Sequence, residues 1–281
     1  MERLPLPDAL VRQARAYADG SATAAEPRNA ATVVLMRPAP AGPEVYLLRR
    51  QTSMAFAGGM CVFPGGGVDP RDFDHAVAWA GPSPAAWAER LGVDERMARA
   101  LVCAAVRETF EESGVLLAGT AESVVADTTG DDWEADRVAL EGRDLSLTEF
   151  LDRRGLVLRA DLLGAWAGWL TPVFEPKRYR TWFFAASLPV GQVTRDVSSE
   201  SSSVAWLPAM TAVEQAEAGD IFMMPPTYLT CLDVGQHADP DEVLAEAAGR
   251  SVEMFTPAVV SDGEEFVLSM PAHYEPLVAA R

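Results

Sequence analysis

The sequence predicts an α/β or α+β fold for this chain of 281 residues. Short apolar, β-compatible runs lie on both sides of one long helical segment at 94–113. A mostly helical block follows the last of these runs, from about residue 209 onward. The hydrophobic content of 49% is enough to bury a sizeable core, so we expect a single domain that spans residues 1–281.

The first half of the chain is predicted to contain a β-hairpin, a short strand and the long helix. Residues 31–36 and 44–48 are apolar runs on either side of a segment rich in Pro and Gly, which is typical of a hairpin. Residues 60–63 form a further short strand before a run of three glycines. Asp94 is a candidate N-cap for the long helix, and Gly114 is placed to end it.

The second half is predicted to complete the sheet and to add a helical tail. Residues 121–141 are acidic and are expected to form a mobile loop. Three further strands are expected, at 162–170, 181–188 and 203–207. The tail is expected to contain helices and a closing β segment, at 211–218, 226–236, 240–249 and 252–270.

The amino-acid composition limits the kinds of partner that we expect the protein to bind. The net charge of −18 argues against nucleic-acid binding, which depends on neutralising phosphates. No apolar run approaches the ~20 residues that span a bilayer, and residues 1–20 lack the apolar region of a secretory signal. Cys61, Cys103 and Cys231 lack metal-type spacing and are expected to be reduced thiols. We therefore expect a cytoplasmic protein that does not bind membranes.

The end of the long helix carries the most informative cluster of the chain. Glu108, Glu111 and Glu112 are spaced to share one helix face. Like charges that close repel each other, and the cluster is most easily explained by a cation held over it. Carboxylate oxygens favour hard divalent cations, Mg²⁺ first and Mn²⁺ second. The alternative is a solvated acidic helix end without a ligand.

The cluster belongs to a longer motif. Residues 107–115 read R-E-T-F-E-E-S-G-V and resemble the second half of the Nudix box, G-x5-E-x7-R-E-U-x-E-E-x-G-U with U apolar. The upstream run Phe63-Pro64-Gly65-Gly66-Gly67 resembles the glycine turn that opens the box. Gly66 and Arg107 lie 41 positions apart, against 14 in the simple pattern, which leaves 27 additional residues. A box split in this way resembles the branch that contains the peroxisomal coenzyme A diphosphatase and its bacterial relatives.

The resemblance implies a fold and an activity. The fold is a Nudix-type α/β/α sandwich around a mixed sheet, with a core at about 30–208, a helical insertion inside the box at about 73–93 and a helical C-terminal extension at about 209–281. The implied activity is that of a divalent-metal-dependent pyrophosphohydrolase, which uses activated water to cleave a nucleoside diphosphate linked to another group. A coenzyme A or acyl-coenzyme A type substrate is slightly favoured. ADP-ribose or NADH, and a nucleotide-binding sensor without turnover, remain alternatives; a homodimer is left open.

The resemblance also suggests roles for single residues. Glu108, Glu111 and Glu112 are the expected ligands of Mg²⁺ or Mn²⁺. Arg107 joins the catalytic group as the residue that ties the glycine turn to the helix by pairing with a box carboxylate. Glu112 is a further catalytic candidate, and the general base is left open between Glu111 and Glu200.

Two features of the site stay undecided. The first glutamate of the box is missing, and either Asp69 or Asp72 stands close enough to replace it. The substrate-binding candidates are two glycines that let the backbone approach phosphate, two arginines shortly before them and one arginine from a later basic cluster, namely Gly65, Gly66, Arg49, Arg50 and Arg178. An ion-paired surface residue is the alternative for each arginine.

Overall fold

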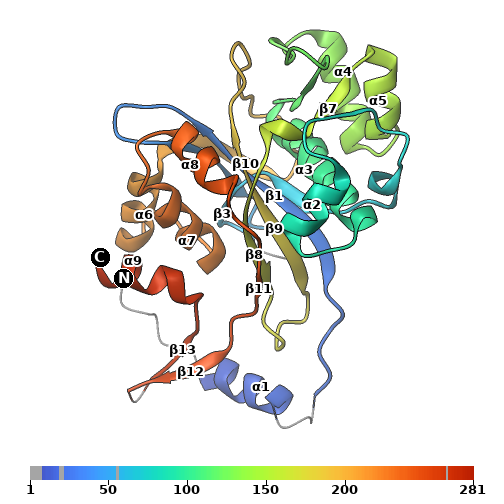
Figure 1. Cartoon of the computed structure of the whole chain (residues 1–281). Coiled ribbons are helices and arrows are strands. Elements are labelled where there is room, and N and C mark those ends of the chain that lie inside the picture. Colours follow the sequence, from blue (N-terminus) through green and yellow to red (C-terminus); the bar gives the residue numbers. More distant parts are fainter. Residues whose placement is uncertain (1–7, 19–21, 55–56, 264) are drawn as a thin grey trace.

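A mixed β-sheet runs through the middle of the computed structural model, which describes residues 8–18, 22–54, 57–263 and 265–281 (Figure 1). Its strands lie in the order β10-β2-β1-β9-β8-β11. Their bounds are β1 (Arg28–Arg37), β2 (Glu44–Arg50), β8 (Gly164–Leu170), β9 (Tyr179–Ser187), β10 (Ser201–Pro208) and β11 (Met254–Phe255). β1 pairs antiparallel with β2, as the hairpin prediction required, and parallel with β9.

Side chains of the central strands alternate between two buried cores. In β1, Val33 and Leu35 belong to one core, whereas Val34 and Met36 belong to the other. β2 and β9 divide in the same way. Because successive side chains of a strand point to opposite faces, both faces of this sheet need a covering layer.

Helices provide both layers, so the predicted α/β/α sandwich is confirmed. One face carries α2 (Pro84–Leu91), α3 (Glu95–Ser113) and α5 (Leu147–Arg154). The other face carries α6 (Ala209–Ala218), α7 (Pro225–Val234) and α8 (Pro240–Ala247). The helices expected in the C-terminal extension therefore form the second layer of the sandwich.

The long helix α3 begins and ends where its sequence predicts. The side chain of Asp94 accepts a hydrogen bond from the Met97 amide at 2.8 Å, as an N-cap does. Gly114 ends the helix with a left-handed φ of +74°. A Cβ at this position would lie 2.7 Å from Nε of Arg195, so a side chain here would displace that guanidinium in addition to straining the backbone.

The insertion inside the box is part of the core. A short 3₁₀ turn (Pro70–Phe73) leads to β5 (Trp79–Ala80) and α2. β5 pairs with β7 (Val157–Arg159), which also pairs with β6 (Ala118–Gly119). Trp87 of α2 is fully buried and its ring centre lies 5.7 Å from that of Phe184 in β9. Packing of this kind explains why the extra residues do not disturb the glycine turn.

The prediction of a loop at 121–141 is wrong for its second half, because α4 (Asp131–Glu141) is a helix. Its central residue, Arg137, is only 3% exposed and pairs with Glu134 and Glu141, three and four residues away. The prediction took the acidic residues for a solvated loop. A buried arginine neutralises two of them instead.

An aromatic cluster fixes α4 to its neighbours. The ring of Trp133 lies 6.5 Å from that of Phe110 in α3 and 6.1 Å from that of Phe150 in α5. The guanidinium of Arg154 stacks over the same indole at 3.6 Å. Trp133 therefore joins three helices.

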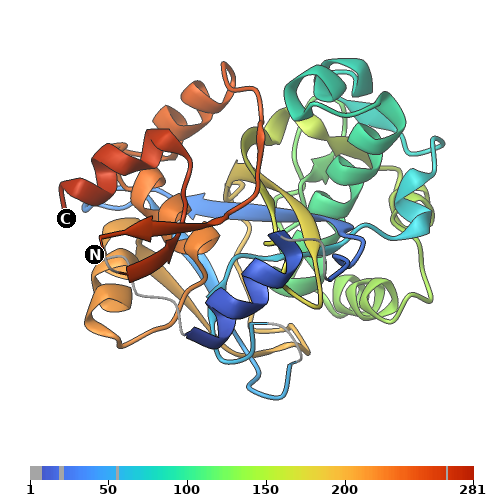
Figure 2. The same cartoon turned by 90° about the horizontal axis from the view of Figure 1, so that it is seen from below.

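The N-terminal helix lies beside the C-terminal hairpin (Figure 2). The C-terminal hairpin consists of β12 (Val259–Asp262) and β13 (Glu265–Leu268), as the expected closing β segment suggested, and α9 (Glu275–Ala279) follows it. α1 (Asp8–Ala18) contacts this hairpin through Arg15, whose guanidinium lies 5.1 Å from the ring of Phe266. Among the described helices, none combines the length and the apolar character that crossing a bilayer requires.

We expect Trp133→Ala to lower the free energy of unfolding by about 3 kcal/mol, because it removes the aromatic contact shared by α3, α4 and α5. Val138→Ala on the same helix is the control: Val138 is 52% exposed, so its change should stay within about 0.5 kcal/mol. Urea unfolding measures both values. Equal effects of the two substitutions would contradict the structural role of Trp133.

Candidate active site

The glycine turn lies directly against α3. It forms β4 (Gly65–Gly67), which pairs antiparallel with β1, and the adjacent strand β3 (Cys61–Val62) pairs with β2. The amide of Gly65 donates a hydrogen bond of 2.7 Å to Oε2 of Glu112. A Cβ on Gly66 would lie 2.5 Å from Oε1 of Glu108. A side chain on Gly66 would therefore displace the carboxylate of Glu108.

Arg107 connects the turn, the insertion and the helix. Its side chain is 9% exposed. Nε and Nη2 each donate to one carboxylate oxygen of Asp72 at 2.9 Å, and Nη2 also donates to the carbonyl of Gly67 at 3.1 Å. Nη1 donates to Glu108 at 2.8 Å and to Glu111 at 3.1 Å. One guanidinium thus has three carboxylate partners and a carbonyl from the turn.

Asp72, rather than Asp69, makes the contact to Arg107. The Asp72 carboxylate is 2% exposed and also accepts the amide of Asp69 at 2.8 Å. Asp69 instead caps the 3₁₀ turn and pairs with Arg71 at 2.9 Å. The two aspartates left open by the sequence therefore have different partners, and only Asp72 occupies the place expected of a box carboxylate that pairs with the arginine.

The three glutamates lie in an environment that favours protons or cations. Burial raises the pKa of Glu108 although Arg107 opposes the shift, and it raises the pKa of Glu111 to about 7 against the same opposition. Burial also raises the pKa of Glu112 well above its usual range, and the charge of Glu108 adds to this effect. A cation between Glu108 and Glu112 would lower both pKa values, because its charge would offset the lost solvation and the repulsion between the two carboxylates.

The residues present suit a divalent cation. Glu108 and Glu112 offer hard carboxylate oxygens beside a backbone turn that has no side chains. Within the described parts of the chain, no three His, Cys, Asp or Glu side chains form a ready-made metal cage. Mg²⁺ is commonly held by one or two carboxylates together with waters and substrate phosphates, and two glutamates satisfy that mode of binding.

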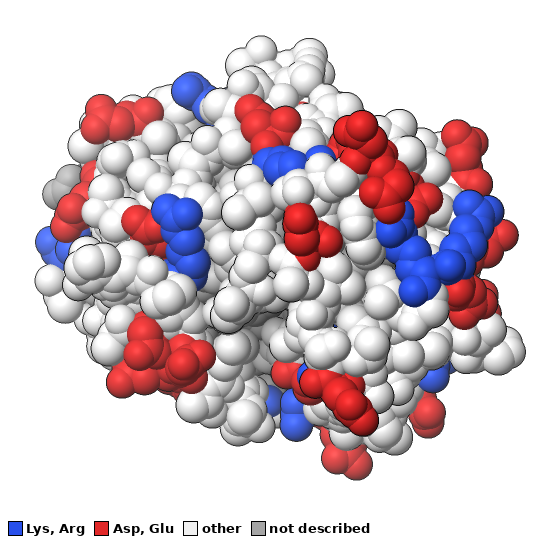
Figure 3. Space-filling view, turned by 90° about the horizontal axis from the view of Figure 1, so that it is seen from above, with Lys and Arg blue, Asp and Glu red and all other residues white. Residues whose placement is uncertain are grey.

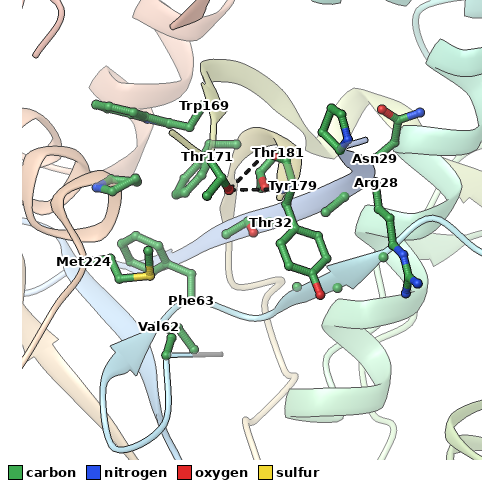
Figure 4. A pocket seen from close by; sticks show the side chains of 18 of the residues that line it. Arg28, Asn29, Thr32, Val62, Phe63, Trp169, Thr171, Tyr179, Thr181 and Met224 are labelled. Carbon is green, nitrogen blue, oxygen red and sulfur yellow. Dashed lines mark hydrogen bonds between the residues drawn. The ribbon is translucent and has the colours of Figure 1, made fainter. Parts of the chain in front are cut away.

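A cavity of about 1080 Å³ opens next to the glutamates. One end is lined by the glycine turn with Glu108, Glu112 and Glu200. The other end is apolar and is lined by Phe63, Trp169, Phe183 and Met224, several of which Figure 4 labels. Phe63 and Phe183 meet edge to face with ring centres 6.3 Å apart. The cavity therefore joins a charged end to an apolar end.

Segments from both ends of the chain cover this cavity. Leu10 of α1 and Leu268 of β13 both line it, and so do Pro225 and Pro226 at the start of α7. α1 is fixed to the β8–β9 connection, because Gln13 donates to the carbonyl of Phe174 at 2.8 Å. The second helical layer and the terminal hairpin thus shape the space in which a ligand would lie.

The structure brings some of the predicted residues to the cavity. Glu108, Glu112, Glu200, Arg50 and Gly65 line it. Gly66 and Arg107 do so as well. The carboxylate of Glu200, which follows a loop distant in sequence, pairs with Nη2 of Arg50 at 2.8 Å.

Three predicted residues lie elsewhere. Glu111 directs its carboxylate to Arg107 and is not among the described residues that line the cavity. Arg178 is 8% exposed and donates to the carbonyls of Thr171 and Ala25. Its guanidinium therefore links two backbone segments. Arg49 donates weakly to the carbonyl of Gly59 at 3.4 Å, and like Arg178 it is absent from the described lining.

Other lining residues were not predicted from the sequence. Arg28, Thr32, Tyr179 and Thr181 come from β1 and β9, and Arg143 follows α4. The parallel pairing of β1 with β9 brings the first four together. The sequence contains no local signal for this pairing. The positive φ of Arg143 (+63°) likewise became visible only in the structure.

Charge is distributed unevenly between the surface and the site. On the face seen from above, acidic and basic side chains are interspersed (Figure 3). Many of the arginines lie against carboxylates, as Arg154 does with Asp132 and Asp136. The net charge of −18 therefore leaves few cations available to an anionic ligand, and the arginines at the cavity gain importance for that reason.

Together, the mixed sheet, the glycine turn and the buried glutamate helix define the class of Nudix hydrolases. A family model described as the NUDT19 Nudix domain matches residues 85–232, more than half of the chain. The chain belongs to this family of hydrolases, which use divalent metal ions.

Individual relatives agree with this assignment. The chain is 27% identical over 254 residues to "Putative nudix hydrolase 7" of Caenorhabditis elegans, covering 88% of this chain and 74% of the relative. It is 25% identical over 297 residues to "Acyl-coenzyme A diphosphatase NUDT19" of Gallus gallus, covering 87% of this chain and 78% of the relative. A solved structure, a NUDIX hydrolase from Alicyclobacillus acidocaldarius, superposes with a TM-score of 0.66 at 26% identity and covers 81% of this chain and 98% of that one.

The contact between Asp72 and Arg107 gives the first prediction for the site. Asp72→Asn should lower the free energy of unfolding by about 3 kcal/mol, because it removes one charge from a buried, bidentate pair. Asp69→Asn should cost no more than about 1 kcal/mol, since its partner Arg71 is 35% exposed and asparagine is also a good N-cap. Denaturant unfolding of both variants tests the difference, and the reverse order would assign the box role to Asp69.

Proposed function

We propose that this chain is a divalent-metal-dependent pyrophosphohydrolase for coenzyme A or acyl-coenzyme A type substrates. The observation that carries the proposal is the single cavity of about 1080 Å³ that joins an acidic, glycine-lined end to an apolar end. A nucleoside diphosphate linked to a long thiol or thioester arm has the same two-part character. The volume is also sufficient for such a ligand.

The acidic end supports cleavage of a diphosphate. A divalent cation bound by Glu108 and Glu112 would supply charge neutralisation for the diphosphate and would polarise the phosphorus under attack. Gly65, Gly66 and Gly67 carry no side chains of their own, so their backbone can lie close to the two glutamates and to a phosphate bound beside them. Arg107 holds the turn and the helix in register through Asp72 and Gly67, and this fixed geometry is what orients the substrate.

The apolar end supports the choice of substrate. Phe63, Phe183 and Met224 offer surface to an alkyl or acyl arm, and Trp169 lies in the same part of the lining. The relative from Gallus gallus carries the name acyl-coenzyme A diphosphatase. We therefore place the diphosphate at the glutamates and the pantetheine or acyl arm toward Phe63 and Met224.

Glu200 is the general base of this proposal. The reaction needs a carboxylate that accepts a proton from the attacking water. Glu200 lines the cavity, and its charge is one of the causes that raise the pKa values of Glu108 and Glu112, after burial and closer charges. Arg50 positions its carboxylate through the 2.8 Å ion pair. Glu111, the competing candidate, has its carboxylate bonded to Arg107.

Two alternatives remain open to experiment. ADP-ribose and NADH also contain a nucleoside diphosphate and would use the same acidic end. A nucleotide-binding sensor without turnover was suggested by the missing first glutamate of the box. The contact of Asp72 with Arg107 weakens that reason, because it supplies the carboxylate partner that the arginine needs.

A substrate panel tests the proposal directly. Purified protein with Mg²⁺ should convert coenzyme A and acyl-coenzyme A into phosphomonoesters with a higher kcat/KM than ADP-ribose, NADH or diadenosine polyphosphates. Liquid chromatography of the products measures this. A higher kcat/KM for ADP-ribose or NADH would move the assignment to those substrates, and binding without turnover on the whole panel would support the sensor.

Glu112→Gln tests the metal site. We expect turnover to fall by more than about a hundredfold, because the amide is a poor ligand for a hard cation and cannot replace the charge. The rise in melting temperature that Mg²⁺ gives the native protein should be lost as well. Glu95→Gln, an exposed glutamate on the same helix, is the matched control and should keep both properties. Normal turnover in Glu112→Gln would remove this residue from the metal site.

Glu200→Gln tests the base. Turnover should fall by about 10²–10⁴-fold, while the stabilisation by Mg²⁺ should remain, since Glu108 and Glu112 are intact. Glu111→Gln is the informative comparison. A larger loss of kcat in Glu111→Gln, together with unchanged Mg²⁺ stabilisation, would transfer the role to Glu111.

A further inference from the structure

Two arginines at the cavity lack the partners that arginines elsewhere in the site have. Among the described residues, four arginines line the cavity: Arg28, Arg50, Arg107 and Arg143. Arg107 has three carboxylate partners and Arg50 pairs with Glu200. The side chain of Arg28 makes no hydrogen bond or ion pair with any residue that the structure describes. Arg143 reaches a carboxylate, that of Asp69, only at 3.8 Å.

The carboxylate next to Arg143 is already occupied. Both oxygens of Asp69 accept hydrogen bonds from the guanidinium of Arg71, at 2.9 and 3.3 Å. The side chain of Arg143 is 77% exposed, and Arg28 is exposed too. Both guanidinium groups therefore remain available to an anion that enters the cavity from solvent.

The backbone presents Arg143 in a strained conformation. Its φ of +63° is unfavourable for a residue with a Cβ. Its carbonyl accepts a 2.7 Å hydrogen bond from Nη1 of Arg71, and its amide donates to Leu140 at 2.9 Å. Among the described non-glycine residues only Ala57 and Arg143 have a positive φ, and both line the cavity. Strain held in place at a cavity points to a role there.

Arg28 is held next to the short segment formed by Val68 and Asp69. It pairs with Tyr179 at the parallel junction of β1 and β9. The carbonyl of the next residue, Asn29, accepts the amide of Val68 at 2.9 Å. Since Asp69 follows Val68 and adjoins Arg143, both arginines adjoin the segment that leaves the glycine turn.

This segment lies away from the apolar end of the cavity. In Figure 4, Arg28 and Asn29 lie on one side and Phe63 and Met224 on the other, with Thr32 and Tyr179 between them. A ligand whose diphosphate lies at the glycine turn would thus extend one arm to the apolar residues and the other toward the arginines.

We infer that Arg28 and Arg143 together form a subsite for a phosphomonoester carried by the substrate, separate from the diphosphate that is cleaved. This inference rests on the proposed function. A phosphomonoester carries about −1.5 to −2 charges near neutral pH, and guanidinium groups bind it through paired hydrogen bonds. In coenzyme A, the phosphate on the 3′ position of the ribose is such a group. ADP-ribose and NADH lack it, so the subsite favours coenzyme A type substrates over both.

The surrounding carboxylates leave room for this phosphate. Glu108, Glu112 and Glu200 lie at the metal end of the cavity, and Asp69 is bonded to Arg71. The remaining lining carboxylate in the described chain, Glu175, belongs to the β8–β9 connection. The rim next to Val68 therefore offers the guanidinium groups of Arg28 and Arg143, and its carboxylate, that of Asp69, is already paired with Arg71.

The kinetic test compares two substrates that differ only in this phosphate, coenzyme A and 3′-dephospho-coenzyme A. The native protein should favour coenzyme A in kcat/KM by about tenfold or more, which corresponds to one well-placed charged hydrogen bond. In Arg28→Gln and in Arg143→Gln this ratio should fall toward one, mainly through KM. Arg153→Gln, an exposed arginine on α5 outside the cavity lining, should keep the native ratio. A native ratio near one, or variants that keep the native ratio, would overturn the subsite.

A binding test is independent of turnover. Calorimetry with adenosine 3′,5′-bisphosphate and with AMP should show tighter binding of the bisphosphate to the native protein and no such preference in Arg28→Gln. Hydrolysis of neither coenzyme A substrate, with the bisphosphate preference intact, would defeat the proposed function and leave the subsite standing. Equal binding of the two nucleotides, with coenzyme A hydrolysed, would defeat the subsite alone. Thermal unfolding of each variant shows that the fold is retained.

Discussion

The buried guanidinium of Arg107 is the interaction on which the site depends. An arginine that is 9% exposed is tolerated only when its donors are paired, and here Asp72, Glu108 and Glu111 pair with it. The bond to Asp72 and the nearby glutamates raise the pKa of Arg107 even though burial opposes this, so the side chain stays charged. The same charge lowers the pKa values of Glu108 and Glu111 against the rise that burial causes.

Glu112 is the carboxylate that this arginine does not bond. Its contacts are the amide of Gly65 and the charge of Glu108, and burial together with that charge raises its pKa well above the usual range. Three carboxylates, those of Asp72, Glu108 and Glu111, surround a single guanidinium, and the fourth, Glu112, lies next to Glu108 without contacting the guanidinium. One positive charge cannot balance them, and the imbalance is greatest between Glu108 and Glu112. A divalent cation fits there on electrostatic grounds as well as on the chemistry of its ligands.

The same tether explains how the box tolerates its insertion. Asp72 and Arg107 are 35 residues apart in sequence, yet their side chains form a bidentate pair. The residues between them form β5 and α2 and bury Trp87 against Phe184, so they add to the core beside the site. The geometry of the glycine turn therefore depends on the two ends of the insertion, which are fixed, and its interior is free to contribute packing.

Whether the sequence predicts a feature depends on how far apart along the chain the residues that stabilise it lie. α3, its cap at Asp94, its end at Gly114 and the glycine turn carry local signals, and they were predicted nearly to the residue. α4 was missed because its acidic residues suggested a solvated loop, and because contacts that hold it, such as Trp133 with Phe150, join separate helices. The lining residues of β1 and β9, Arg28 among them, were missed because these strands pair across about 150 residues, as the 151-residue separation of Asn29 and Arg180 illustrates.

The split between local and long-range signals coincides with a split in function. The groups proposed for chemistry lie mainly on α3 and the glycine turn, whereas much of the cavity that surrounds a ligand comes from β9, α7, α1 and the C-terminal hairpin. Substitutions at Met224 or Leu268 change the space around a ligand arm without touching Glu108 or Glu112. Substrate choice can therefore vary in this fold while the end of the cavity that binds the diphosphate stays constant. For the same reason, a short sequence motif predicts the chemistry but not the substrate.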